Sequence, residues 1–153
     1  MNLKTVADAI AARYVGITAT VGNTTETVSA TASLHNQVGK LALLVYPPTG
    51  DLSIGLGRMR DDSLDFPVRL LRDPFSMPAR SDWLYAWTTA LRDRLETNMD
   101  LDLSYVAWAQ CVSLRVEPDG ESYASLEGSL ASFDVVEFIV RVHLTEVVSS
   151  VAI

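Results

Sequence analysis

One stretch near the end of the chain constrains the fold more than any other. Its apolar positions recur at every second residue, as Val136, Phe138, Val140, Val142 and Leu144, and the positions between them are Glu137, Ile139, Arg141 and His143. Side chains two residues apart share one face of a β-strand. We therefore expect a strand with one buried face, which requires both a sheet and a layer that covers it.

Two other stretches have helical periodicity and predict that covering layer. Residues 2–14 carry an apolar stripe of Leu3, Val6, Ala7, Ile10 and Tyr14, and Gly16 is a natural stop. Residues 81–97 carry a second stripe of Leu84, Trp87, Leu91 and Leu95, with Ser81 as the expected N-cap. The sequence thus predicts an α+β fold, with a mixed or mainly antiparallel sheet and one face covered by these two helices.

Further strands are expected along the rest of the chain. Residues 41–46 form a short apolar run, residues 52–56 and 64–71 alternate, and Pro67 suggests an edge position or a bulge. Residues 17–38 carry a turn signal at Gly22-Asn23, and Thr27–Ala32 within them predict an edge strand or an ordered loop. Residues 106–116 alternate up to a turn predicted at Pro118-Asp119-Gly120, and residues 122–128 predict a weaker strand. The length of 153 residues fits a single domain, residues 1–153.

The sequence offers little for catalysis or metal binding. The only histidines are His35 and His143, and the single cysteine, Cys111, falls within an apolar alternation that predicts a buried, inert thiol. Zinc needs more soft ligands than these, and no nucleophile elbow or phosphate-binding loop is present. The three tryptophans fit core positions better than a stacking surface. We expect no enzyme activity, no cofactor and no metal.

Charge and hydropathy limit the partners. No apolar run approaches the roughly 18 residues of a membrane helix. The net charge is −7, and residues 93–153 hold eleven acidic residues against three basic ones. Proteins that hold nucleic acid usually present a basic patch, because phosphate contacts dominate their affinity. The distribution predicts either an ordinary solvated acidic surface or a surface that repels DNA.

The order of these features resembles the tail terminator proteins of long-tailed phages, especially those of actinobacterial hosts. The resemblance spans most of the chain and ends with the alternating strand described above. Its earlier pieces are Val6–Tyr14, Leu41–Pro48, Phe66–Pro74 and Trp83–Trp87.

The resemblance implies a structural protein of the virion, assembled in the host cytoplasm. Such a protein forms a ring, usually a hexamer, that caps the tail tube and provides the surface that joins the head. Its partners are further copies of itself, the tail tube protein and the head-completion or stopper protein, and DNA passes through without specific binding. A stopper protein of the same neck, and a small cytoplasmic ligand-binding or enzymatic α+β domain, remain alternatives.

Two sets of residues are candidates for these contacts. We expect residues 47–63 to form a projecting loop or arm that places Arg58, Arg60, Asp61 and Asp62 at a subunit interface. We also expect acidic residues at helix ends and turns to line a central channel. These are Glu96, Asp100, Asp102, Glu117, Asp119, Glu121 and Glu127.

Overall fold

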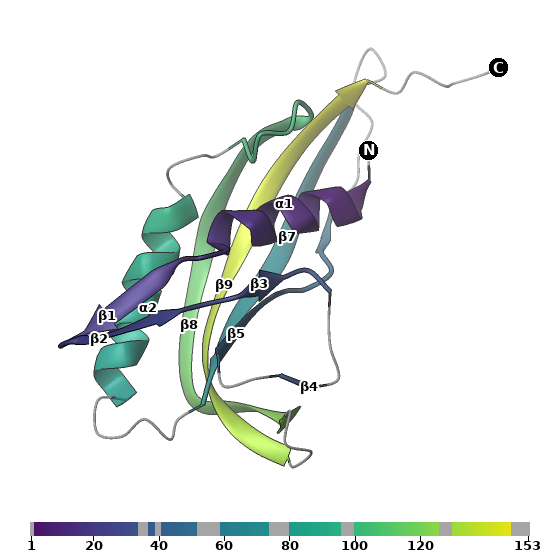
Figure 1. Cartoon of the computed structure of the whole chain (residues 1–153). Coiled ribbons are helices and arrows are strands. Elements are labelled where there is room, and N and C mark those ends of the chain that lie inside the picture. Colours follow the sequence, from purple (N-terminus) through teal and green to yellow (C-terminus); the bar gives the residue numbers. More distant parts are fainter. Residues whose placement is uncertain are drawn as a thin grey trace.

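A computed structural model describes residues 2–33, 37–38, 41–51, 59–73, 80–95, 100–125 and 130–147. Within these ranges there are two helices, α1 (Leu3–Tyr14) and α2 (Arg80–Leu95). The strands are β1 (Thr18–Val21), β2 (Thr24–Thr27), β3 (Ala30–Thr31), β4 (Gln37–Val38), β5 (Leu41–Val45), β6 (Thr49–Asp51), β7 (Met59–Arg72), β8 (Val106–Ser125) and β9 (Leu130–Val147). The fold is α+β, as predicted (Figure 1).

The first helix follows its sequence signals closely. The Asn2 side chain accepts a hydrogen bond of 2.9 Å from the Lys4 amide and so caps the N-terminus. Gly16, just beyond the helix, has a φ of +75°, which glycine adopts without strain. The predicted turn at Gly22-Asn23 joins β1 to β2 in an antiparallel hairpin. The second helix begins at Arg80. Ser81 therefore lies in its first turn, and the prediction of Ser81 as the N-cap is wrong.

Seven strands form the main sheet in the order β3-β5-β7-β9-β8-β4, with β6 also paired to β7. The sheet is mixed, because β3 runs parallel to β5 and β4 parallel to β8, and the other pairs are antiparallel. The long strand β9 lies between β7 and β8, so the alternating stretch occupies the centre of the sheet (Figure 1).

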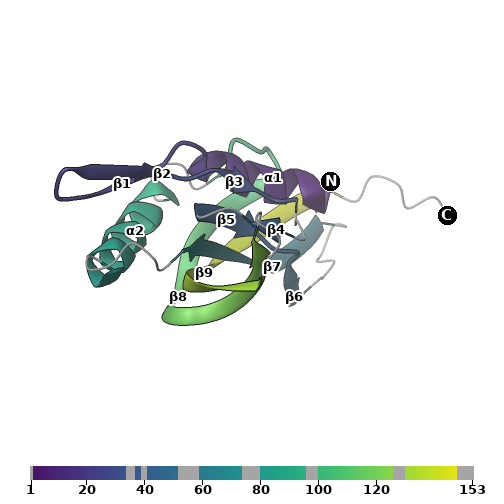
Figure 2. The same cartoon turned by 60° about the horizontal axis from the view of Figure 1, so that its bottom comes forward.

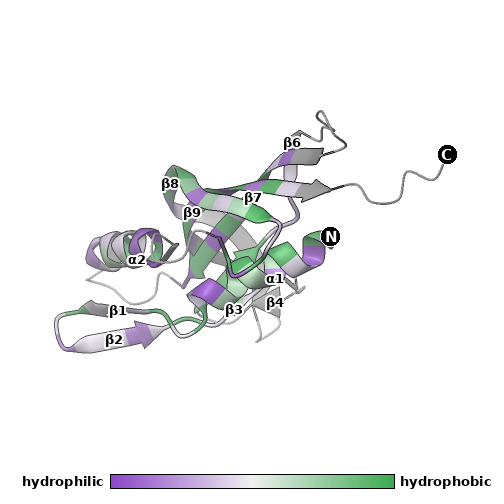
Figure 3. Ribbon diagram, turned by 90° about the horizontal axis from the view of Figure 1, so that it is seen from above, coloured by the Kyte–Doolittle hydropathy of each residue, from purple (hydrophilic) through white to green (hydrophobic). Residues whose placement is uncertain are grey.

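The helices and the β1–β2 hairpin lie over one face of the sheet, which we call the covered face (Figure 2). All five apolar alternating positions of β9 are buried there, as predicted, together with Leu64, Phe66, Val68 and Leu70 of β7. The other side, the outer face, carries the intervening residues. The alternation of hydrophobic and hydrophilic residues along the strands is visible in Figure 3.

The register of β8 differs from the prediction because the strand contains bulges. Register shifts between Val106 and Trp108 and between Cys111 and Ser113 leave an extra residue at each place. Trp108 is therefore half-buried on the outer face, where it stacks on His143 with a ring separation of 5.3 Å. The prediction of Trp108 as a core residue is wrong, whereas Trp83 and Trp87 are buried as expected.

The predicted turn at Pro118-Asp119-Gly120 is a bulge in a continuous strand. Glu117 pairs with Val135 and Glu121 with Phe133, so three residues of β8 oppose one residue of β9. The β8–β9 hairpin curls strongly in this region (Figure 2). On the two sides of the bulge, Val135 and Phe133 pack with Leu44 and Leu71 of the outer face and form a second small core. The turn chemistry thus bends the hairpin without reversing it.

Pro67 lies in a central strand, contrary to the edge position expected. Its carbonyl accepts a 2.8 Å hydrogen bond from the Tyr46 amide, so its ring nitrogen faces the same side, away from β9. On that side β5 ends at Val45 and β6 begins at Thr49. The missing N–H of proline therefore falls where the neighbouring strand is interrupted.

A buried ion pair ties the β1–β2 hairpin to the sheet. The Arg72 guanidinium is 1% exposed and contacts the Glu26 carboxylate at 3.0 and 3.2 Å. The indole N–H of Trp87 donates to the same carboxylate at 3.0 Å, and the Arg72 guanidinium lies over the Trp83 ring. One carboxylate thus joins the hairpin, β7 and α2.

Candidate interaction surfaces

The described residues contain no group of three or more His, Cys, Asp or Glu side chains that could hold a metal ion. Neither helix in those residues is long and apolar enough to cross a membrane. His143 faces Trp108 on the outer face, and His35 lies outside the described residues. The exposed surfaces of the sheet and of α2 are the candidates for contacts with macromolecules.

Apart from Pro47 and Pro48, the described residues of the predicted arm, residues 47–63, belong to the sheet. Thr49–Asp51 form β6, which pairs with Ser63–Asp65, and β7 begins at Met59. Arg60 and Asp61 are β7 residues paired with β9, and Arg58 lies outside the described residues. Asp62 is fully buried on the covered face, which differs from the exposed position expected for an interface residue. The sequence analysis began this strand at Leu64. In the structure β7 begins at Met59, so Asp62 continues the inward-facing series of Leu64 and Phe66.

The acidic candidates do not form one patch. Asp100 and Asp102 are exposed in the loop before β8, where Asp102 approaches Arg13 at 3.7 Å. Glu117 pairs with Arg115 at 3.1 Å toward the other end of the straight part of β8. Asp119 and Glu121 follow at the bulge region, and Glu96 and Glu127 lie outside the described residues. Val106 and Glu117 pair with Leu144 and Val135, which are nine residues apart in β9. The two ends of this stretch are therefore separated by about 30 Å, and the two groups are far apart.

The outer face carries a set of ion pairs that the sequence did not reveal. The Glu137 carboxylate contacts Arg69 of β7 and Arg115 of β8, so it joins three adjacent strands. Arg141 contacts Asp65 through two hydrogen bonds of 2.8 and 3.1 Å. The bond to Asp65 raises the pKa of the Arg141 guanidinium. All three arginines of this face that the structure describes thus have a carboxylate partner within the sheet.

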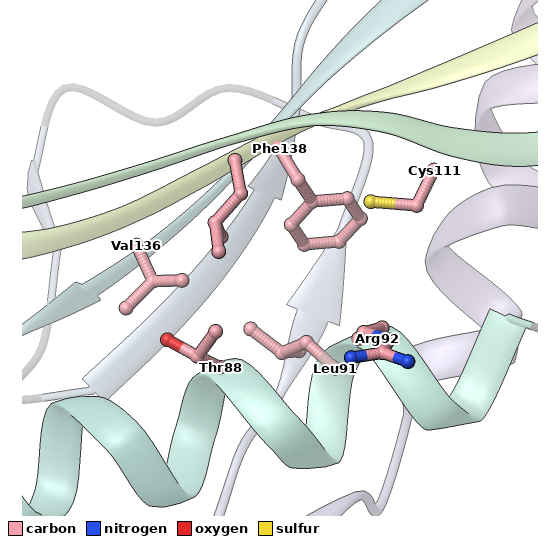
Figure 4. Close-up of a pocket in the computed structure, with 7 residues that line it drawn as sticks. Thr88, Leu91, Arg92, Cys111, Val136 and Phe138 are labelled. Atoms are coloured by element: carbon pink, nitrogen blue, oxygen red, sulfur yellow. The ribbon is translucent and has the colours of Figure 1, made fainter.

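A narrow apolar groove lies between α2 and the sheet, close to β8 (Figure 4). It is lined by Thr88, Leu91 and Arg92 of α2, Cys111 and Leu114 of β8, and Val136 and Phe138 of β9. Cys111 is partly exposed here, which corrects the prediction of a fully buried thiol. The bulge after Cys111 keeps its side chain on the covered face, but at the margin of the core.

Close to this groove, the Tyr14 phenol is fully buried and its hydroxyl has no hydrogen-bond partner among the described atoms. Burial raises the pKa of the Tyr14 phenol well above its ordinary value; the Cys111 thiol adds to the shift, and Arg13 opposes it. Tyr14 therefore lies in the core as a neutral phenol.

The chain matches no protein-family model and no curated protein.

Proposed function

We propose that this protein is a tail terminator of a long-tailed phage, a structural protein that closes into a ring on the end of the tail tube. The observation that carries the proposal is the outer face. In the described part of the chain it is a broad sheet surface without a helical layer. Its arginines Arg69, Arg115 and Arg141 are each neutralised by a carboxylate of the same sheet.

A channel for DNA must avoid holding phosphates, and unpaired arginines would hold them. The paired arginines of the outer face leave little positive charge for phosphate binding, although the face is polar and partly exposed. The net charge of −7 adds a repulsive field to every copy in the ring. Of the acidic candidates, the groups at the two ends of β8 would then lie at different depths along the channel.

The resemblance supports the same proposal. The described residues of its pieces supply α1, β5, β7, α2 and β9, which together build the covered face and its core. They thus include the elements on which the fold depends.

The experiment is an assembly assay with the tail tube protein encoded in the same genome. Tube protein is polymerised with and without this chain, and tube lengths and the position of a gold-labelled copy are recorded by electron microscopy. We expect shorter, uniform tubes with label at one end only. Label along the tubes, or none, would overturn the proposal, and binding to heads that lack tails would indicate the stopper protein.

A charge variant tests the outer face separately. Replacing Asp65 and Glu137 by asparagine and glutamine removes carboxylate partners of all three arginines and keeps the side-chain shapes. We expect DNA binding, measured by filter retention at low salt, to rise at least tenfold. The matched control, Asp8→Asn on the exposed side of α1, removes a carboxylate elsewhere and leaves DNA binding unchanged.

A further inference from the structure

The strand β8 has an open edge beside the apolar groove. One side of β8 pairs with β9 along its length, and on the other side β4 pairs only with Ala124 and Ser125. In the described part of the chain, residues 106–117 thus have no strand beside them on the edge that points away from β9. Such an edge presents unpaired backbone groups that a further strand can use.

The groove provides an apolar binding surface next to this edge. Leu114 is 55% exposed and Val116 is 39% exposed, although both point to the covered face with Phe138 and Val136 as their register partners. A strand added beside β8 would place its inward side chains next to Leu114 and Val116, on the side of the groove that Thr88 of α2 also lines. It would complete a core layer that stops short at β8.

The bulges of β8 limit where such a strand fits. Register shifts occur between Cys111 and Ser113 and between Glu117 and Glu121. Between them, Ser113–Glu117 pair regularly with β9. The regular edge therefore suits a segment of about five or six residues, with apolar side chains two positions apart that match Leu114 and Val116.

Residues 148–153 have the chemistry for this place. They read Val-Ser-Ser-Val-Ala-Ile, carry no charged side chain, and follow directly after β9. Val151 and Ile153 are two residues apart and would share one face of a strand. Valine and isoleucine also favour a pleated, half-buried surface.

The groove of the same copy is out of reach for these residues. Phe138 lies nine residues before Val147, which corresponds to about 30 Å along β9. Six residues span at most about 22 Å when fully extended. Residues 148–153 therefore reach this groove only in a second copy.

We propose that residues 148–153 of one copy add as a strand to the β8 edge of a second copy, at Ser113–Glu117, with Val151 and Ile153 seated in the groove. Donor and acceptor are different surfaces, so the contact is head-to-tail and generates a ring or a chain of copies. The inference needs only a second copy, and it stands or falls independently of the phage function.

Cysteine cross-linking tests the contact directly, because Cys111 lines the groove. The variant Val151→Cys is oxidised with copper phenanthroline and analysed on a non-reducing gel. We expect covalent dimers and higher oligomers to form at least tenfold faster than in Thr24→Cys, an exposed control in the β1–β2 hairpin. Adding Cys111→Ser to Val151→Cys removes this product if the proposal holds. Cross-linking no faster than the control would overturn it.

A binding assay checks the same contact without assembly. The chain lacking residues 148–153 is titrated against a fluorescein-labelled peptide of residues 147–153, followed by anisotropy. We expect saturable binding that weakens at least tenfold with Leu114→Asp, a substitution at an exposed side chain. The matched control is Tyr85→Asp on the exposed side of α2, which leaves binding unchanged. Absence of saturation, or binding that is insensitive to Leu114→Asp, contradicts the proposal. In the cross-linking experiment, dimers linked through Cys111 alone would indicate instead that two β8 edges pair with each other.

Discussion

The two faces of the sheet are built from the same strands but stabilised in different ways. On the covered face, alternate residues of β7 and β9 are apolar and buried under α1 and α2. On the outer face, the residues between them form ion pairs across β7, β9 and β8, with a small apolar core only where the curled hairpin packs on β5 and β7. Burial therefore provides most of the stability on one face, and the other face is left for charge and contacts.

The difference follows from how the two kinds of interaction scale. Burying a large apolar side chain stabilises a fold by about 1.5–3 kcal/mol. Partly exposed ion pairs are worth about 0–1 kcal/mol, because water and salt screen them. The covered face should hence determine whether the chain folds. The outer face should determine the electrostatic field that other molecules meet.

The largest loss of stability should come from Phe138→Ala, compared with a matched substitution at the next position of β9. Phe138→Ala removes a ring that is 2% exposed and packs edge-on against Tyr14, and it should lower the free energy of unfolding by about 3–5 kcal/mol. Ile139→Ala changes the next residue, which is partly exposed on the outer face, and should cost only about 1 kcal/mol. Urea denaturation of both variants measures the contrast, and equal losses would remove the distinction between the faces.

A smaller loss of stability is expected when the Glu137 carboxylate, which Arg69 and Arg115 share, loses its charge. Glu137→Gln keeps the side-chain shape and removes the charge, so it should lower the free energy of unfolding by about 1 kcal/mol. The loss should shrink in 1 M salt, where the Debye length falls to about 3 Å. A loss above about 3 kcal/mol, or one insensitive to salt, would mean that the outer face behaves as a core.

The smallest effect on stability at neutral pH is expected at Tyr14, the last residue of α1, whose phenol is buried in the core. Tyr14→Phe removes a buried hydroxyl that has no hydrogen-bond partner in the described structure, so stability at pH 7 should stay the same or rise by up to about 1 kcal/mol. In the wild type, the raised pKa of Tyr14 keeps the folded phenol neutral. The unfolded phenol ionises above its ordinary pKa of about 10.

This linkage has a definite sign. The contribution of neutral Tyr14 is complete below about pH 10 and is lost as the pH rises further, by up to about 1.4 kcal/mol per pH unit. The Tyr14→Phe variant lacks that loss, so its stability should fall less steeply in alkaline solution. Parallel curves for the two proteins between about pH 8 and about pH 11 would show that the phenol is solvated in the folded state.

Several elements could be predicted from the sequence because their signals are local. The alternation of β9, the apolar stripe of α1 with its stop at Gly16, and the turn at Gly22 each involve residues within one turn or a few positions of each other. The positions of the candidate contact residues depended on the tertiary structure, and their roles stay predictions. Asp62 is buried, Arg60 and Asp61 belong to a long strand, and the acidic residues lie at separate ends of β8.

The sequence by itself determined the α+β class, the buried face of β9 and the apolar sides of both helices, because side-chain periodicity fixes which residues share a face. Only the tertiary structure decided the bulges of β8, the place of Pro67 beside an interrupted strand, and the curl at Pro118-Asp119-Gly120. It also decided the pairing of Arg72 with Glu26 and of Glu137 with two arginines. These features depend on the register between segments tens of residues apart, and local pattern does not specify which partner such a segment meets.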